Sequence, residues 1–363
     1  MLQPDRPYNQ LPLLPPRSEV ETRAVMKACI EARVALAEMR TAGQLIPNQS
    51  VLINSIPMLE AQASSEIENI VTTADRLFRF ADNVASDQLD PATKEALRYR
   101  TALYRGFRLL ETRSVSTTLA VEICRMIRGA NVDIRSTRGT ALAGDATGKV
   151  VYTPPMGETL IRDMLANWER YIHDATDIDP LVRMAVMHYQ FEAIHPFTDG
   201  NGRTGRILNI LFLIEQGVLS IPILYLSRHM IRTRRDYYRL LLKVTTDAAW
   251  EEWILYVLNA VFETATWTTA KIRAIQALLE STADSIRTQL PKIYTRELVE
   301  VVFMQPYTRI GNVVDAGIAK RQAASAYLKS LVKIGVLEEH KIGREKLFLN
   351  SALLATLTDQ QSA

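Results

Sequence analysis

The densest group of chemically capable residues in this chain is the segment from His195 to Arg206, which reads His-Pro-Phe-Thr-Asp-Gly-Asn-Gly-Arg-Thr-Gly-Arg. Pro196 disfavours helical geometry at His195, so the preceding helix is predicted to stop there. The histidine is then left at a helix–loop junction. An imidazole with an ordinary pKa of ~6.5 can remove a proton from an attacking hydroxyl. The segment therefore offers a candidate general base beside a loop.

The middle of this segment is suited to binding an anion. Gly200, Asn201 and Gly202 are the residue types that enter left-handed backbone conformations most readily, so their N–H groups can converge into an anion nest. The nest opens into a predicted helix over 204–216, whose N-terminus adds partial positive charge. A Gly-Asn-Gly run by itself is most often a plain turn. Its place before a helix favours an anion site.

Charged side chains on both sides of the nest sharpen this interpretation. Arg203 and Arg206 are three residues apart and project from one face of the first helical turn. Two arginines at a helix start are electrostatically unfavourable unless an anion is bound, and together with the nest they indicate a polyphosphate. Asp199 can hold a Mg²⁺ that bridges phosphate oxygens. The segment is neither a P-loop nor a His-Glu-x-x-His zinc site.

The segment resembles the signature of the Fic family, His-x-Phe-x-Asp/Glu-Gly-Asn-Gly-Arg-x-x-Arg, and matches it at every fixed position. The resemblance implies a mainly α-helical Fic fold. It also implies transfer of AMP from ATP to a hydroxyl of a protein substrate, usually on Tyr, Ser or Thr. The target can include the chain itself. Other chemistries of the family transfer a different phosphate-bearing group with the same motif, and they stay open.

The resemblance assigns a role to each motif position. His195 is the general base, Phe197 anchors the loop in the core, and Asp199 coordinates Mg²⁺ between the α- and β-phosphates. Arg203 holds the β- and γ-phosphates, and Arg206 fixes the γ-phosphate. The glycines and Asn201 form the anion hole, with Asn201 placing the α-phosphate. The implied ATP-binding set is Glu68, Gly200, Asn201, Gly202, Arg203, Thr204, Gly205, Arg206 and Tyr237.

Tyr237 enters this set through the pair Tyr237-Tyr238, which resembles an aromatic pair that lies near the base of the nucleotide in Fic proteins. A tyrosine pair on a helix is more often core packing. Some relatives place an Asn eight residues beyond the first tyrosine, where this chain has Thr245.

The run Ser64-Ser65-Glu66-Ile67-Glu68-Asn69 is, by itself, a solvated acidic helix face. Beside a Fic motif it resembles the inhibitory helix pattern Ser/Thr-x-x-x-Glu-Gly/Asn, in which Ser64, Glu68 and Asn69 match the fixed positions. Ser64 and Glu68 are four residues apart and share a helix face. The resemblance implies that Glu68 pairs with Arg206 and blocks productive ATP binding, an inhibition that needs no separate antitoxin.

Residues 137–157 hold two short β-prone runs around a glycine-bearing turn, which predicts a hairpin. A surface hairpin is the plain interpretation. The resemblance makes it the flap that clamps the backbone of the target by β-augmentation.

The elements that must position this site are predicted to be helical. The first 18 residues are rich in proline and read as an extended arm. Helical spacing starts at Ser18, and Gly43 is expected to end that first helix. The predicted divisions are an N-terminal helical region with the inhibitory helix over 1–105, a Fic catalytic core over 106–260, a connecting helix over 261–290 and a winged helix-turn-helix domain over 291–363.

The C-terminal domain is predicted from short helices over 296–303, 309–316 and 320–334, followed by a hairpin with its turn at Ile342-Gly343-Arg344. Residues 309–346 hold eight Lys or Arg against four Asp or Glu. A basic winged helix commonly binds DNA through its last helix and its wing. Docking to protein, or pairing with a second copy as a homodimer, is the alternative.

Composition limits the remaining choices. The 363 residues are 47% hydrophobic and 23% charged with a formal net charge of +3, which excludes a disordered chain and a uniformly basic coat. Cys29 and Cys124 are too few for a disulfide framework. No stretch approaches the ~20 apolar residues of a membrane span, and the start does not resemble a signal peptide. We therefore expect a cytoplasmic protein that has no membrane partner.

Two functions of different classes follow. The first is a protein adenylyltransferase that uses ATP and Mg²⁺ and is held back by Glu68. The second is a nucleotide-sensing DNA-binding transcriptional regulator. The intact His195 and Asp199 favour the first, because a sensor needs neither a base nor strict placement of a metal.

Overall fold

The computed structural model describes residues 2–81, 89–137, 141–143, 148–342 and 345–359. Over these residues the chain is mainly helical, with a two-stranded and a three-stranded antiparallel sheet. The predicted turn of the first hairpin at 144–147, and the predicted wing residues Gly343 and Arg344, lie outside the described residues. No helix of the described chain combines the length and the apolar character that a membrane span requires.

The N-terminal arm reaches across the molecule before the first helix. The backbone N–H of Tyr8 donates to the carbonyl of Thr153 at 2.9 Å, and the N–H of Leu14 donates to Asn167 Oδ1 at 2.8 Å. The arm therefore fastens to segments that follow it by about 150 residues. The helices of the N-terminal region are α1 (Arg23–Leu45), α2 (Ser50–Ile67), α3 (Ala74–Arg79) and α4 (Pro91–Leu109).

Gly43 does not end the first helix, because α1 continues to Leu45. A Cβ on Gly43 would lie 3.4 Å from Ile223 Cδ1 and 3.6 Å from Leu52 Cδ1. The small residue therefore sits at a close contact with other elements and has no role as a left-handed cap. Tertiary packing, which the local sequence does not reveal, sets the end of this helix.

The core is built around α7 and α8, which are buried on nearly all sides. Helices that are apolar all round belong inside a protein. Trp168 of α6 donates its indole N–H to the carbonyl of Met187 at 2.9 Å, and Trp253 of α11 donates to that of Ala185 at 2.8 Å. The elements of this part are α5 (Thr117–Arg128), β1 (Leu142–Ala143), β2 (Val150–Tyr152), α6 (Glu158–Asp174), α7 (Pro180–Ile194), α8 (Asn201–Glu215), α9 (Ser227–Arg232) and α10 (Arg234–Asp247).

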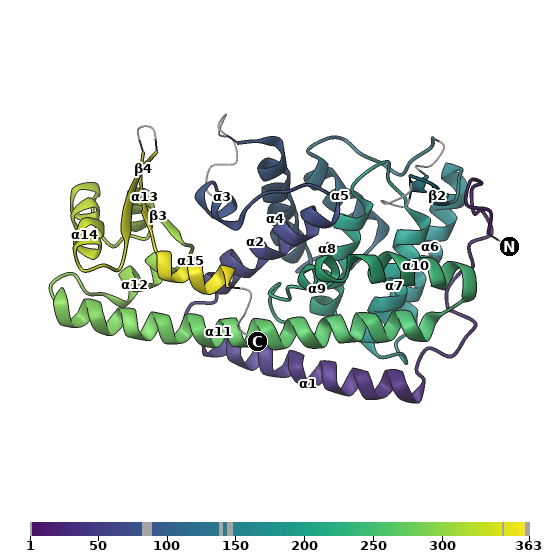
Figure 1. Ribbon diagram of the computed structural model, residues 1–363, viewed down its shortest axis with the longest axis horizontal. Helices are drawn as coiled ribbons and strands as arrows, with labels where there is room; N and C mark the ends of the chain where they lie inside the picture. The colour runs from purple at the N-terminus through teal and green to yellow at the C-terminus, as the bar shows by residue number, and fades with distance from the viewer. Residues whose placement is uncertain (1, 82–88, 138–140, 144–147, 343–344, 360–363) are drawn as a thin grey trace.

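One helix of 40 residues, α11 (Trp250–Gln289), runs along the molecule from the core to the C-terminal domain. At a rise of 1.5 Å per residue it is about 60 Å long. It packs along α1, as Figure 1 shows. The predicted connecting helix 261–290 is thus the second half of a helix that starts inside the core. The predicted boundary at 260/261 falls within α11 and that at 105/106 within α4.

The C-terminal elements follow the order helix, strand, helix, helix and hairpin, with one further helix at the end. The order of strands in the sheet is β3-β5-β4, with Thr308 opposite Phe348 and His340 opposite Leu347. The helix predicted over 309–316 is present as a helix over Ile310–Asp315, and Arg309 is the last residue of a short strand that precedes it. The winged-helix assignment itself stays a prediction. The elements are α12 (Arg296–Phe303), β3 (Tyr307–Arg309), α13 (Ile310–Asp315), α14 (Arg321–Lys333), β4 (Glu338–Ile342), β5 (Glu345–Leu349) and α15 (Ser351–Thr358).

A buried carboxylate fastens α2 to two neighbouring helices. Glu60 of α2 is 1% exposed and accepts hydrogen bonds from the Tyr99 hydroxyl at 3.0 Å, from the Ser227 N–H at 2.9 Å and from the Ser227 hydroxyl at 2.5 Å. Burial raises the pKa of Glu60, and the three donors oppose that shift. These hydrogen bonds fix the position of α2 relative to α4 and α9. They thereby also position the end of α2, where Ser64 and Glu68 lie.

Removal of this anchor should destabilise the fold. We expect Glu60→Ala to lower the free energy of unfolding by about 3 kcal/mol, because three buried donors lose their acceptor, and Glu60→Gln to cost about half as much. Glu66→Ala, a change to a partly exposed carboxylate of the same helix, should stay within about 0.5 kcal/mol. Chemical denaturation of the three variants measures this. Equal stability of Glu60→Ala and Glu66→Ala would contradict the anchoring role.

Candidate active site

The motif loop is held in a defined shape by its own residues. His195 caps α7 with a left-handed backbone (φ 50°), and Gly200 has φ 88° immediately before α8 begins at Asn201. The Asn201 side chain accepts from the Phe197 N–H and donates to the Phe197 carbonyl, both at 2.8 Å. The helix thus begins three residues before the predicted start at Thr204. The Asn201 amide closes the loop in this structure, so its predicted contact with the α-phosphate stays a prediction.

Arg206 is buried against the end of α2. Its guanidinium donates from Nε to the Ser64 hydroxyl and from Nη2 to the Ser64 carbonyl and Glu68 Oε1, each at 2.8 Å. The side chain of Arg206 is only 1% exposed. Burial acts to lower its pKa, but the Glu68 carboxylate outweighs burial and the pKa is raised. The structure therefore brings together three residues that the sequence singled out.

Asn69, the last residue of the predicted inhibitory pattern, follows the end of α2 with φ 62°. Asparagine and glycine tolerate this left-handed conformation better than other residues do, which gives a backbone reason for Gly/Asn at this position. Its side-chain oxygen accepts from Arg234 Nη1 at 3.0 Å. Asn69 therefore shapes the turn after α2 and lies outside the contact with Arg206.

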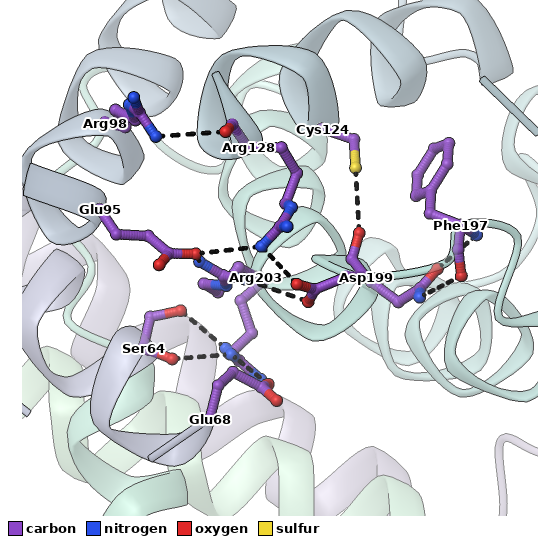
Figure 2. A network of polar contacts seen from close by, with 11 residues as sticks. Ser64, Glu68, Glu95, Arg98, Cys124, Arg128, Phe197, Asp199 and Arg203 are labelled. Carbon is purple, nitrogen blue, oxygen red and sulfur yellow. Dashed lines mark hydrogen bonds and ion pairs between the residues drawn. The ribbon is translucent and has the colours of Figure 1, made fainter. Parts of the chain in front are cut away.

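The other motif arginine, Arg203, is paired with a glutamate that lies outside the sequence motifs (Figure 2). Its Nη1 contacts the carboxylate of Glu95 on α4, and its Nη2 lies 3.4 Å from Asp199 Oδ1. Arg128 of α5 contacts both of these carboxylates, with Nη1 3.5 Å from Glu95 Oε1. Sequence reasoning missed Glu95 and Arg128. Two buried arginines on one turn of a core helix require carboxylates nearby, but the sequence does not show which carboxylates these are.

His195 lies where a neutral base is favoured. Its carbonyl accepts from Arg135 Nε at 2.7 Å, and Arg135 Nη2 reaches the carbonyl of Pro155 at 2.5 Å. Burial, with help from the charge of Arg135, lowers the pKa of His195 to about 4. The imidazole is therefore neutral near pH 7 and able to accept a proton. The same arginine joins the motif loop to the segment that follows β2.

Asp199 fits a role in binding Mg²⁺ together with a polyphosphate. Its side chain is 53% exposed and offers one carboxylate. Among the described residues, no group of three or more His, Cys, Asp or Glu gathers into a metal site of its own. Mg²⁺ is usually held by one or two carboxylates, with the remaining ligands supplied by phosphates and water. The single exposed carboxylate of Asp199 matches this mode of Mg²⁺ binding.

Tyr237 is packed in the core. Its ring is 1% exposed, and its hydroxyl lies 2.9 Å from His188 Nε2. Its predicted place near the base of a nucleotide stays a prediction. The neighbouring Tyr238 is 41% exposed. Thr245 is hydrogen-bonded to the Tyr189 hydroxyl at 2.9 Å.

Two further residues of the predicted ATP-binding set are closely packed. Thr204 is fully buried in α8. Gly205 lies so close to α7 that an added Cβ would be 2.7 Å from Glu192 Oε1. Their predicted contact with ATP stays a prediction.

The predicted hairpin lies next to the motif. β1 and β2 pair in antiparallel fashion, with Leu142 opposite Tyr152. The Tyr152 hydroxyl donates to the carbonyl of Ala193 at 2.8 Å, two residues before His195. The hairpin is therefore tied to the end of α7 beside the candidate base.

Comparisons with known proteins agree with this arrangement. The chain matches the Fic/DOC family N-terminal model over residues 26–108 and the Fic/DOC family model over residues 118–213. Residues 278–353 match the C-terminal domain of SoFic-like protein adenylyltransferases. Together these matches include the inhibitory pattern, the motif and the C-terminal elements.

Among curated proteins, the chain is 35% identical over 86 residues to protein adenylyltransferase fic-1 of Caenorhabditis briggsae, covering 23% of this chain and 16% of that protein. It is 37% identical over 92 residues to protein adenylyltransferase Fic of Nematostella vectensis, covering 25% and 20%. The matches thus span about a fifth or less of these relatives.

Among solved structures, a Fic family protein of Desulfovibrio desulfuricans superposes with a TM-score of 0.59 at 18% identity, covering 93% of this chain and 98% of the other. A Fic-domain signalling protein of Bacteroides thetaiotaomicron gives a TM-score of 0.52 at 16% identity, covering 67% and 96%. These similarities show the fold.

The helical core, the motif loop and the matched models define a protein built on the Fic fold. The chain is a member of the Fic/DOC family, and it carries a further C-terminal domain beyond the Fic core.

The lowered pKa of His195 predicts how its imidazole responds to pH. Because the pKa lies at about 4, the neutral form persists at all higher pH values, and the ring resonances of His195 should not shift between pH 8 and pH 5.5. A histidine NMR titration, with the resonance assigned by its loss in His195→Ala, measures this. A midpoint near ~6.5, the ordinary value, would contradict the inferred environment.

Proposed function

We propose that this protein is an adenylyltransferase that transfers AMP from ATP to a hydroxyl of a protein substrate. The observation that carries the proposal is the complete motif assembled at the N-terminus of α8, with a neutral imidazole on one side and two buried guanidinium groups on the other. The names of the curated relatives support the same activity.

The residues divide the work by position. The N–H groups of Gly200, Asn201 and Gly202 at the N-terminus of α8 bind phosphate oxygens, and Arg203 and Arg206 neutralise the remaining charge. His195 accepts the proton of the target hydroxyl as its oxygen bonds to the α-phosphorus. The bond from that phosphorus to the bridging oxygen breaks, and pyrophosphate leaves. Asp199 would hold Mg²⁺, which supplies further charge neutralisation on the phosphates.

The same geometry supports inhibition by Glu68. Its carboxylate and the Ser64 side chain and carbonyl occupy the donors of Arg206 that a γ-phosphate needs. A second anion at this guanidinium would repel Glu68, so ATP must either displace the end of α2 or bind in another pose. We infer that the conformation described here is the restrained one.

Loss of Glu68 should release this restraint. We expect Glu68→Gly to raise AMP transfer at least ~10-fold in an assay with radiolabelled ATP, because Arg206 becomes free for the γ-phosphate. Glu66→Gly is the matched control, since it loosens the same helix end without touching Arg206. The double variant Glu68→Gly, His195→Ala should return to background. Equal activity of the wild type and Glu68→Gly would refute the inhibitory role.

A regulator that only senses a nucleotide is the less favoured alternative. Such a protein has no need for an imidazole whose pKa is lowered beside the loop, or for a carboxylate from its own chain at Arg206. DNA binding can nevertheless accompany the enzymatic function. α14 contains no acidic residue, and its basic side chains Arg321, Lys329 and Lys333 are exposed. We propose that this helix forms a DNA-binding face.

A gel-shift experiment tests the DNA-binding face directly. The full chain should retard a ~30-base-pair duplex, and affinity should fall steeply with salt because phosphate contacts release counterions. The double variant Lys329→Glu, Lys333→Glu should lose about 100-fold in affinity or more. Arg273→Glu, on an exposed site of α11, is the control for charge alone. If the double variant and the Arg273→Glu control bind the duplex equally well, α14 is not the binding face.

A further inference from the structure

A closed ring of four alternating charges lies beside the motif loop (Figure 2). Arg128 contacts the carboxylates of Asp199 and Glu95, and Arg203 contacts the same two carboxylates. Each arginine thus has two acidic partners and each acid has two basic ones. The ring is neutral as a whole, although two of its members are motif residues for which we propose phosphate and Mg²⁺ binding.

The end of α5 directs the side chain of Arg128 toward this ring of charges. Its carbonyl accepts from Arg98 Nη1 at 3.2 Å, and Gly129 ends the helix with φ 62°. The stem of the Arg128 side chain lies over Gly200, where an added Cβ would be 3.4 Å from Arg128 Cδ and 3.6 Å from Cγ. The stem of Arg128 thus packs on the left-handed glycine, and its guanidinium reaches Asp199 and Glu95.

The members of the ring differ in exposure in a way that suits a ligand entering from solvent. Arg203 is 1% exposed, whereas Arg128 is 35% and Asp199 is 53% exposed. Arg128 and Asp199 form the open side, and Arg203 lies beneath them. Arg128 is therefore the guanidinium of the ring that solvent reaches, and Arg203 is the buried one.

Binding of a polyphosphate with Mg²⁺ would remove the partners of Arg128. Asp199 would then hold the metal in place of Arg128, and phosphate oxygens would compete with Glu95 for both guanidinium groups. We propose that Arg128 is a further phosphate-binding residue of this site, and that Glu95 is the internal anion that Arg128 and Arg203 exchange for the nucleotide. This inference rests on the proposed nucleotide-binding function.

Calorimetric titration of the full chain with ATP and Mg²⁺ tests the proposal, with Glu68→Gly as the parent so that the end of α2 does not compete. Adding Arg128→Gln should raise the Kd about 10- to 100-fold, the loss expected for a charged hydrogen bond. The control variant is Arg125→Gln, one turn earlier on α5. It removes the same charge, but Arg125 contacts Val132 and Asp133, so the Kd should stay within twofold of the parent.

The Glu95→Gln variant separates phosphate binding from a purely structural ring. If Glu95 competes with the nucleotide, its neutralisation should tighten ATP binding about fivefold. If the ring only supports the fold, Glu95→Gln leaves the buried Arg203 short of a partner, and both the melting temperature and the affinity for ATP should fall.

The outcomes are distinguishable. Unchanged ATP affinity in Arg128→Gln, or weaker binding in Glu95→Gln, overturns the inference alone. A parent that does not bind ATP at all overturns the proposed function and this inference with it.

Discussion

The need to pair two buried guanidinium groups is the constraint on which the rest of this structure depends. Arg203 and Arg206 project from the first turn of α8, and each side chain is 1% exposed. An unpaired charge in such a place costs several kcal/mol, so each arginine must have an anion within reach. The N-terminal helices supply those anions, with Glu68 at the end of α2 and Glu95 on α4. These helices therefore complete the site as well as covering the core.

The charges of the site are, as a result, balanced within the chain itself. Each charged group for which we propose nucleotide or metal binding is engaged by a group of opposite sign. Under the proposed function, binding would be an exchange of anions, in which the affinity of the nucleotide is reduced by the contacts that it must displace. Because Glu60 fixes α2 against α4 and α9, the carboxylate at the end of that helix is held in place by packing far from the loop.

Much of the local structure could be predicted from short stretches of sequence. The stop of α7 before Pro196, the left-handed backbone at Gly200 and the hairpin before the motif follow from residue chemistry over a few positions. Other features depended on distant partners. The strand at Thr308 pairs with Phe348, 40 residues later, and a three-residue strand carries too little pattern to be seen. Gly43 lies inside α1 beside Ile223, and the buried Tyr237 has its hydroxyl 2.9 Å from His188 Nε2 of α7.

By itself, the sequence determined the motif, the position of His195 at a helix end and the pairing pattern that links Ser64 and Glu68, because each of these depends on backbone geometry within one or two helical turns. Only the tertiary structure decided which carboxylates face Arg203 and Arg206, that Glu95 and Arg128 join the site, and that α11 continues through the predicted domain boundary. Those contacts join residues up to 138 positions apart. Such pairs are selected by how the helices pack, a choice that no local pattern of residues encodes.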